Sequence, residues 1–90
     1  MGETSIIGTW NINFRAQTLV FVAGGTVQST SGEDLGTWTQ DGGNIVFKTG
    51  VPPINYFIYV GEVTENTMTG WVSDGYLPLG KWIANRVTGS

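Results

Sequence analysis

The segment Ile6–Phe14 reads Ile-Ile-Gly-Thr-Trp-Asn-Ile-Asn-Phe, and it carries the two features that decide the fold. Apolar and polar side chains alternate along it, which predicts a strand with one buried face. A glycine stands just before the tryptophan, and similar steps recur at Gly36-Thr37-Trp38, Gly70-Trp71 and Gly80-Lys81-Trp82. Glycine lets a strand bend and tryptophan fills a large volume, so the repeated step favours a small, strongly curved barrel filled by a few large rings.

The rest of the chain continues this pattern, and no segment has a sustained helical period. Turns rich in Gly, Asn and Asp separate eight short predicted strands. These strands are Ile6–Phe14, Thr18–Ala23, Thr26–Ser29, Gly36–Gln40, Ile45–Thr49, Tyr56–Val63, Met68–Val72 and Lys81–Val87. Short connectors favour antiparallel neighbours, and closure removes two exposed sheet edges. We therefore expect an all-β fold, a small eight-stranded antiparallel up-and-down meander barrel without substantial helix.

Length and period-two alternation also assign the domain and its faces. Ninety residues suit a single domain over 1–90. Several aliphatic residues nevertheless fall on outward positions of the predicted strands. If the last strand closes onto the first, one stripe contains Ile7, Val20, Val22 and Ile83, and another contains Val46, Ile58 and Val60. Because contiguous exposed apolar area usually marks an interface, we expect a homo-oligomer.

Composition argues against several classes of function. The net charge is −3, and the four basic residues are spread along the chain, so no nucleic-acid partner is expected. The absence of histidine and cysteine removes the usual general base, thiol nucleophiles and the preferred transition-metal ligands. The run from Gly75 to Lys81 has the spacing of a phosphate-binding loop, but Trp82 stands where that motif needs Ser or Thr. We expect a non-enzymatic protein with no metal and no cofactor.

The acidic residues are also dispersed. Glu33, Asp34, Asp41 and Asp74 lie in predicted turns, whereas Glu62 lies inside a strand and points outward by parity. No apolar run approaches the length of a membrane span, and no secretory signal is visible. These observations predict no membrane span and, by default, a cytoplasmic location.

Gly8 and Trp10 on the first strand, together with Arg86 on the last, resemble the calycin group, which includes lipocalins and avidin-like barrels. In that group an arginine packs across the first tryptophan and closes one end of the barrel. The resemblance implies a lipocalin-like barrel in which Gly8, Trp10, Trp82 and Arg86 form the closure. The alternative for Arg86 is that it holds the carboxylate of a ligand inside the barrel.

The predicted core rings are expected to fill the barrel, which directs any ligand to the loop end. That end is lined by the three longest predicted connectors, Thr30–Leu35, Gly50–Asn55 and Ser73–Leu79. The candidate contacts there are Trp71, Tyr76, Pro52 and Pro53, with Asp74 or Asn55 orienting the ligand. The leading hypothesis is a lipocalin-like module for a small apolar molecule. The alternatives are a lectin-like module that stacks sugars on Trp71 and Tyr76, and a structural subunit of a homo-oligomer.

Overall fold

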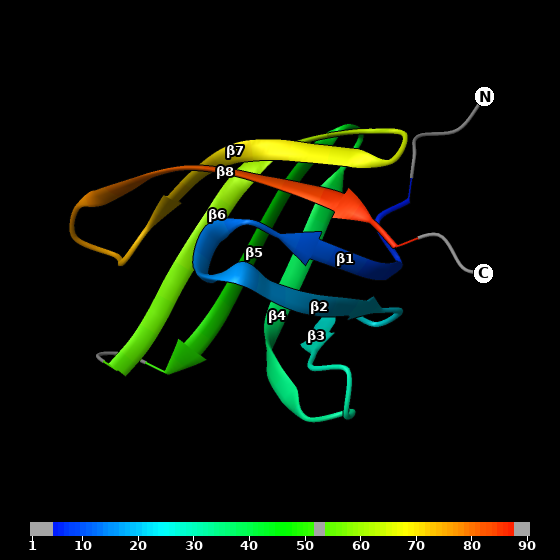
Figure 1. Cartoon of the computed structure of the whole chain (residues 1–90), viewed down its shortest axis with the longest axis horizontal. Helices are drawn as coiled ribbons and strands as arrows, with labels where there is room; N and C mark the ends of the chain where they lie inside the picture. Colours follow the sequence, from blue (N-terminus) through cyan, green and yellow to red (C-terminus); the bar gives the residue numbers. More distant parts are fainter. Residues whose placement is uncertain (1–4, 52–53, 88–90) are drawn as a thin grey trace.

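The computed structural model describes residues 5–51 and 54–87, and in this part of the chain eight antiparallel strands close into a barrel (Figure 1). The strands are β1 (Gly8–Ile12), β2 (Gln17–Val22), β3 (Thr26–Gln28), β4 (Asp34–Asp41), β5 (Asn44–Val51), β6 (Ile54–Thr64), β7 (Thr67–Ser73) and β8 (Pro78–Arg86). Each strand pairs with the next in sequence, and β8 pairs with β1. The predicted all-β meander barrel is confirmed. No membrane-spanning helix is found among the described residues.

The strand ends differ from the prediction because cross-strand pairing continues into the expected loops. Val51 pairs with Ile54, so most of the connector predicted over 50–55 is strand. Similarly, β8 starts at Pro78 opposite Ser73, which reduces the predicted loop 73–79 to residues 74–77. By contrast, β1 is shorter than predicted. It ends at Ile12, because a single 3₁₀ turn, Phe14–Ala16, carries the chain directly into β2.

Aromatic rings fill the interior of the barrel. The ring of Phe47 stacks on that of Tyr59 with centroids 4.4 Å apart, and Trp82 meets both rings edge-on. Phe21 packs against Phe47 from the opposite side, with centroids 4.9 Å apart. The fully buried side chains also include Trp10, Ile6, Leu19, Val27, Met68 and Val72. The interior of this barrel is therefore a packed core, as close packing of large side chains requires.

Each tryptophan of the interior satisfies its indole N–H with a backbone carbonyl. Trp10 donates to Ile6, Trp38 donates to Val22, and Trp82 donates to Trp71, each across 2.9 Å. A buried donor without a partner costs free energy, so these bonds make it favourable to place indole rings inside a small barrel.

Inward-facing glycines let the strands cross closely. A Cβ on Gly36 would collide with the backbone of Lys48, and one on Gly70 would collide with the carbonyl of Val60. Gly61, which pairs with Gly70, is equally confined by the backbone of Thr69. Only glycine fits where neighbouring backbones approach in this way, and the strands can then coil tightly around the core.

The predicted apolar stripes on the outer wall are only partly continuous. Ile83 lies beside Asn13, its hydrogen-bonding partner at one end of β1. Ile7 instead precedes the other end of β1, where Gly8 pairs with Phe21 and Thr9 with Val20. The expected stripe of Ile7, Val20, Val22 and Ile83 is therefore broken, because the register of strand pairing separates Ile83 from the others. The second stripe is continuous, since Val46 pairs with Val60 and Ile58 stands next to Val60 on the same face of β6.

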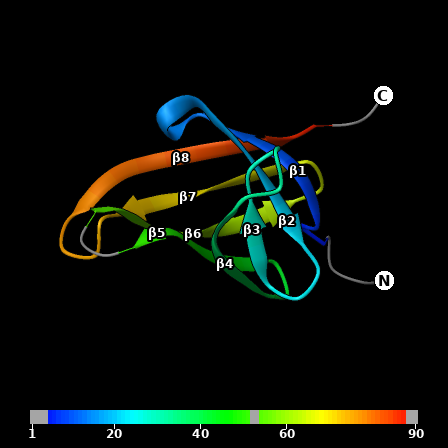
Figure 2. The ribbon, with the colours of Figure 1, turned by 90° about the horizontal axis from the view of Figure 1, so that it is seen from below.

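The β5–β6 and β7–β8 hairpins extend together beyond the body of the barrel (Figure 2). The molecule is consequently elongated, with principal extents of 38 × 25 × 23 Å. A Cβ on Gly75 would lie 3.7 Å from the ring of Tyr56, so the tip of the β7–β8 hairpin rests on β6. The loop between β3 and β4 lies apart from these two tips along the long axis in both views.

Candidate functional site

Arg86 closes the end of the barrel opposite the projecting hairpins. Its guanidinium lies over the ring of Trp10, with the Cζ atom 4.5 Å from the ring centroid. The same group donates hydrogen bonds to the carbonyls of Ser5 and Ile7 and to Oδ1 of Asn66, over 2.7, 3.1 and 3.2 Å. Gly8 leaves room for this arrangement, because a Cβ there would lie 3.1 Å from the guanidinium. Trp82 lies deeper in the core, against Phe47 and Tyr59.

Trp71 differs from the other tryptophans because its side chain is 52% exposed on the outer wall. It stands on β7 between Val60 of β6 and Lys81 of β8, which are its cross-strand partners. The Nζ atom of Lys81 lies 5.3 Å from the centroid of the ring. A large planar apolar surface is therefore presented to solvent on a rigid strand, with a cation beside it.

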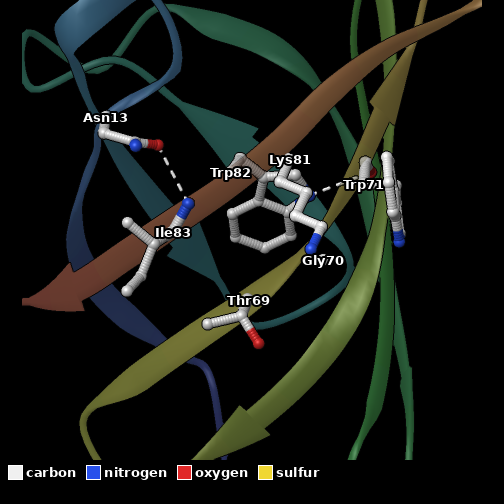
Figure 3. Close-up of a pocket in the computed structure, with 7 residues that line it drawn as sticks. All are labelled: Asn13, Thr69, Gly70, Trp71, Lys81, Trp82 and Ile83. Atoms are coloured by element: carbon white, nitrogen blue, oxygen red, sulfur yellow. Dashed lines mark hydrogen bonds between the residues drawn. The ribbon is translucent and has the colours of Figure 1, made fainter.

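Two open depressions flank Trp71, one on each side of β7. The first, of about 450 Å³, extends over β8 and is lined by Asn13, Thr69, Gly70, Trp71, Lys81, Trp82 and Ile83 (Figure 3). The second, of about 500 Å³, extends over β6 and β5 and is lined by Asn44, Ile45, Val46, Val60, Gly61, Glu62, Thr69, Gly70 and Trp71. Together they form one trough across four strands. The backbone of Gly61 and Gly70 lies between its two outward rows of side chains.

The two banks of the trough differ in chemistry. Val46, Val60 and Trp71 align across the strands and form an apolar bank that ends at Lys81. The facing bank follows the next outward row and is mainly polar, and its members are Asn44, Glu62, Thr69, Ile83 and Asn13. Figure 3 shows Asn13 and Ile83 on one side of the first depression and Trp71 on the other. An apolar plate thus faces a row of hydrogen-bonding groups.

Asn13 is held in position for a polar contact. Its Oδ1 accepts the N–H of Ile83 over 2.9 Å, and its own backbone N–H donates to the carbonyl of Ile83 over 3.0 Å. The side-chain N–H groups of Asn13 make no hydrogen bond to another described residue, so they remain available as donors.

Of the residues predicted for the loop end, the two aromatic side chains lie on different parts of the molecule. Tyr76 is 86% exposed at the tip of the β7–β8 hairpin, whereas Trp71 lies on the wall. Pro52, Pro53 and the side chain of Asn55 lie outside the described residues. The β3–β4 loop stands apart from the two projecting tips, so the three connectors do not line a common mouth.

Asp74 has a local role in the hairpin tip. Its carboxylate accepts the backbone N–H groups of Tyr76 and Leu77, each over 2.9 Å. Both hydrogen bonds lower the pKa of Asp74 below its usual value, and the bond from Leu77 has the larger effect. In this arrangement the carboxylate fixes the turn rather than pointing toward a ligand.

Sequence reasoning identified Trp71 but not the polar bank opposite it. Asn13, Asn44 and Thr69 look like ordinary surface residues of separate strands, so the sequence gives no reason to group them. Their outward parity beside a strand that carries an exposed tryptophan was the available signal. Which outward residues become neighbours depends on the register, and the register was not predicted.

In the described part of the chain, His, Cys, Asp and Glu form no group of three that could hold a metal ion.

Comparison of the chain with protein-family models, with curated proteins and with solved structures finds no match.

Proposed function

We propose that this chain is a non-enzymatic carbohydrate-binding module, and that its ligand lies in the trough on the outer wall against Trp71. The observation that carries the proposal is the half-exposed indole of Trp71, which faces a bank of hydrogen-bonding side chains across the trough. A pyranose ring has an apolar C–H face and a rim of hydroxyl groups. The C–H face can stack on an aromatic ring, and the hydroxyl groups can form hydrogen bonds with Asn, Glu and Thr side chains.

Other placements of a small ligand have less support. The packed rings of Phe47, Tyr59 and Trp82 occupy the region where a lipocalin would hold an apolar ligand. The small apolar molecule expected at the loop end would meet Tyr76 on a projecting tip, whereas small-molecule sites are usually concave. A relationship to the calycin group remains a proposal, supported by the closed barrel and by Arg86 over Trp10.

The carbohydrate proposal is tested by titrating the protein with glucose, galactose, mannose and N-acetylglucosamine at millimolar concentrations. Trp71 is the most exposed tryptophan described, so a change in tryptophan emission should come mainly from this residue. We expect Trp71→Ala to abolish the response, and Asn13→Ala or Glu62→Ala to weaken it several-fold. The matched control is Tyr76→Ala, which removes an exposed aromatic outside the trough and should leave binding unchanged.

The outcomes separate the candidates. If no sugar perturbs the emission or the amide resonances of residues 69–71 and 81–83, the carbohydrate proposal is wrong. A response to an apolar dye that is lost in Tyr76→Ala supports the loop-end ligand instead. If neither sugars nor apolar dyes bind, the result supports the alternative that the chain is a structural subunit of a homo-oligomer.

We also propose a homodimer, because one exposed apolar patch lies away from the trough. The patch consists of the exposed Ile7 and Val87 together with the half-buried Val20 and Val22 of β2. Ile7 and Val87 are both exposed, and the backbone N–H of Val87 donates to Thr9, whose partner in β2 is Val20. Homodimer interfaces are enriched in apolar area, so a second copy of the same patch is a suitable partner.

A further inference from the structure

The two most exposed large apolar side chains of the described residues, Tyr76 and Leu77, lie at the tip of the β7–β8 hairpin. Tyr76 is 86% exposed, Leu77 is 67% exposed and Leu79 is 45% exposed, with the exposed Pro78 between the two leucines. No charged residue occurs from Gly75 to Gly80. Soluble surfaces normally disperse such residues, so four consecutive exposed apolar residues mark a contact site.

The tip is placed to reach a flat surface. The β7–β8 hairpin extends along the longest dimension of the molecule, beyond the body of the barrel (Figures 1 and 2). Gly75 in the tip lies against the ring of Tyr56, which supports the tip from β6. The tip of the hairpin is convex, whereas the two depressions beside Trp71 lie on the outer wall of the barrel. A ligand of the tip must therefore surround it.

The backbone donors of the tip are already satisfied. Ser73 Oγ accepts the N–H of Gly75, and the Asp74 carboxylate accepts those of Tyr76 and Leu77, each over 2.9 Å. The next residue, Pro78, has no N–H. In addition, the N–H of Asp74 donates to the carbonyl of Leu77 over 3.3 Å. Each backbone N–H from Asp74 to Leu77 is therefore bonded within the loop and Pro78 has none, which lowers the cost of moving these donors out of water.

We propose that residues 76–79 insert into the interfacial region of an uncharged lipid bilayer. A tyrosine with an apolar ring and a polar hydroxyl is typical of that region, and the leucines supply the aliphatic contact. A pocket on another protein would normally also use hydrogen bonds to the loop backbone, whereas the donors of this tip point inward. The net charge of −3 favours neutral over anionic lipids. Because the tip is short, binding is reversible.

The proposal is tested by flotation of the full chain with phosphatidylcholine vesicles at millimolar lipid. We expect the protein to float, and Leu79→Asn to lower its partition about fivefold, because the buried aliphatic area is lost. The matched control is Ile83→Asn, since Ile83 is also an aliphatic residue of β8 and is 40% exposed, but on the wall. This control should partition as the unmodified protein does. Adding phosphatidylglycerol should weaken binding.

A second measurement reports which residues enter the bilayer. Leu77→Trp should be quenched by vesicles containing brominated phosphatidylcholine, whereas Ile83→Trp should not. The proposal is overturned if the protein remains in the aqueous fraction at saturating lipid, which would leave a protein pocket as the better occupant. It is also overturned if Ile83→Asn lowers partition as much as Leu79→Asn does. Sugar binding uses Trp71 and the trough, so either proposal can fail without the other.

Discussion

The tryptophans illustrate how surroundings assign different tasks to one residue type. Trp10 is buried and Trp71 is half exposed, yet each lies beneath a cation. Arg86 covers Trp10 at 4.5 Å and also binds backbone carbonyls, whereas Lys81 lies 5.3 Å from the exposed ring of Trp71. A cation–π contact gains strength when it is shielded from water. The first pair should therefore stabilise the fold, and the second should leave its ring available.

Replacing Arg86 is expected to destabilise the barrel without affecting a ligand on the wall. Arg86→Ala removes the contact with Trp10 and the hydrogen bonds to Ser5 and Ile7. We expect a loss of about 2 kcal/mol, which lowers Tm by roughly 8–16 °C for a domain of this size. Urea and thermal unfolding measure both quantities.

The control for this prediction is Lys81→Ala, which removes the cation over an exposed ring. Its expected cost is about 0.5 kcal/mol or less. If Arg86→Ala unfolds as the unmodified protein does but loses binding of a carboxylate ligand, the alternative role of Arg86 is correct.

The Asp74 carboxylate makes the order of the hairpin tip dependent on pH. Hydrogen bonds from the backbone of Leu77 and Tyr76 lower its pKa in the folded state. Its contribution is therefore present above the usual pKa of aspartate and is lost as the pH falls through the lower, folded-state pKa. The amide resonances of Tyr76 and Leu77 should shift in that acidic range, and Asp74→Asn should abolish the transition. A transition at or above the usual pKa of aspartate would contradict this account.

At the scale of elements, the hairpins depend on close backbone approach at inward positions. β6 and β7 approach at Gly61 and Gly70, which form a cross-strand pair. The same step places Trp71 on the opposite face of β7, because successive side chains of a strand alternate. One glycine–tryptophan pair thus serves both the curvature of the barrel and the exposed surface of the trough.

Gly70→Ala is expected to destabilise the protein strongly, because its Cβ would collide with the carbonyl of Val60. The cost should be about 3 kcal/mol or more, since the obstacle is backbone and cannot rotate away. Gly43→Ala is the matched control, because its Cβ would meet only Val63 O at 3.8 Å. The control should change the free energy of unfolding by about 0.5 kcal/mol or less. Equal costs in urea unfolding would show that close approach is not what Gly70 provides.

At the scale of the whole molecule, the outer surface divides into three regions. The trough lies across β5–β8, the apolar tip lies at the end of the long axis, and the patch around Ile7 lies on β1 and β2. Because these regions use different residues, the proposed binding of a sugar, of a bilayer and of a second copy can be tested separately.

Ile7→Asp is expected to convert the proposed homodimer into monomers, because it replaces an exposed apolar side chain of the patch with a charged one. Sedimentation at increasing protein concentration measures the change. Ile83→Asp should leave the dimer intact, since the register places Ile83 beside Asn13 and away from the patch. Monomers at every concentration in the unmodified protein would rule out the dimer.

The period-two pattern and the glycine–tryptophan steps were sufficient for the strands and for the core. Trp10, Phe21, Phe47, Tyr59 and Trp82 are all buried, as their alternation predicted. This succeeds because the side-chain period of a strand is a local property that one buried face is enough to reveal. The turn chemistry likewise located the reversals at 24–25, 41–44 and 65–66, although it missed the 3₁₀ turn Phe14–Ala16 and cross-strand bonds lengthened several strands.

Only the tertiary structure decided which outward residues are neighbours. Asn13, Thr69 and Trp71 meet because three strands pair in one particular register, and Ile83 is separated from Ile7 for the same reason. The separation of Trp71 from Tyr76, which are only five positions apart, follows from the length of the projecting hairpin. Sequence determines what each strand buries through local alternation, but a surface site is assembled from several strands, and its geometry depends on long-range pairing that no local pattern contains.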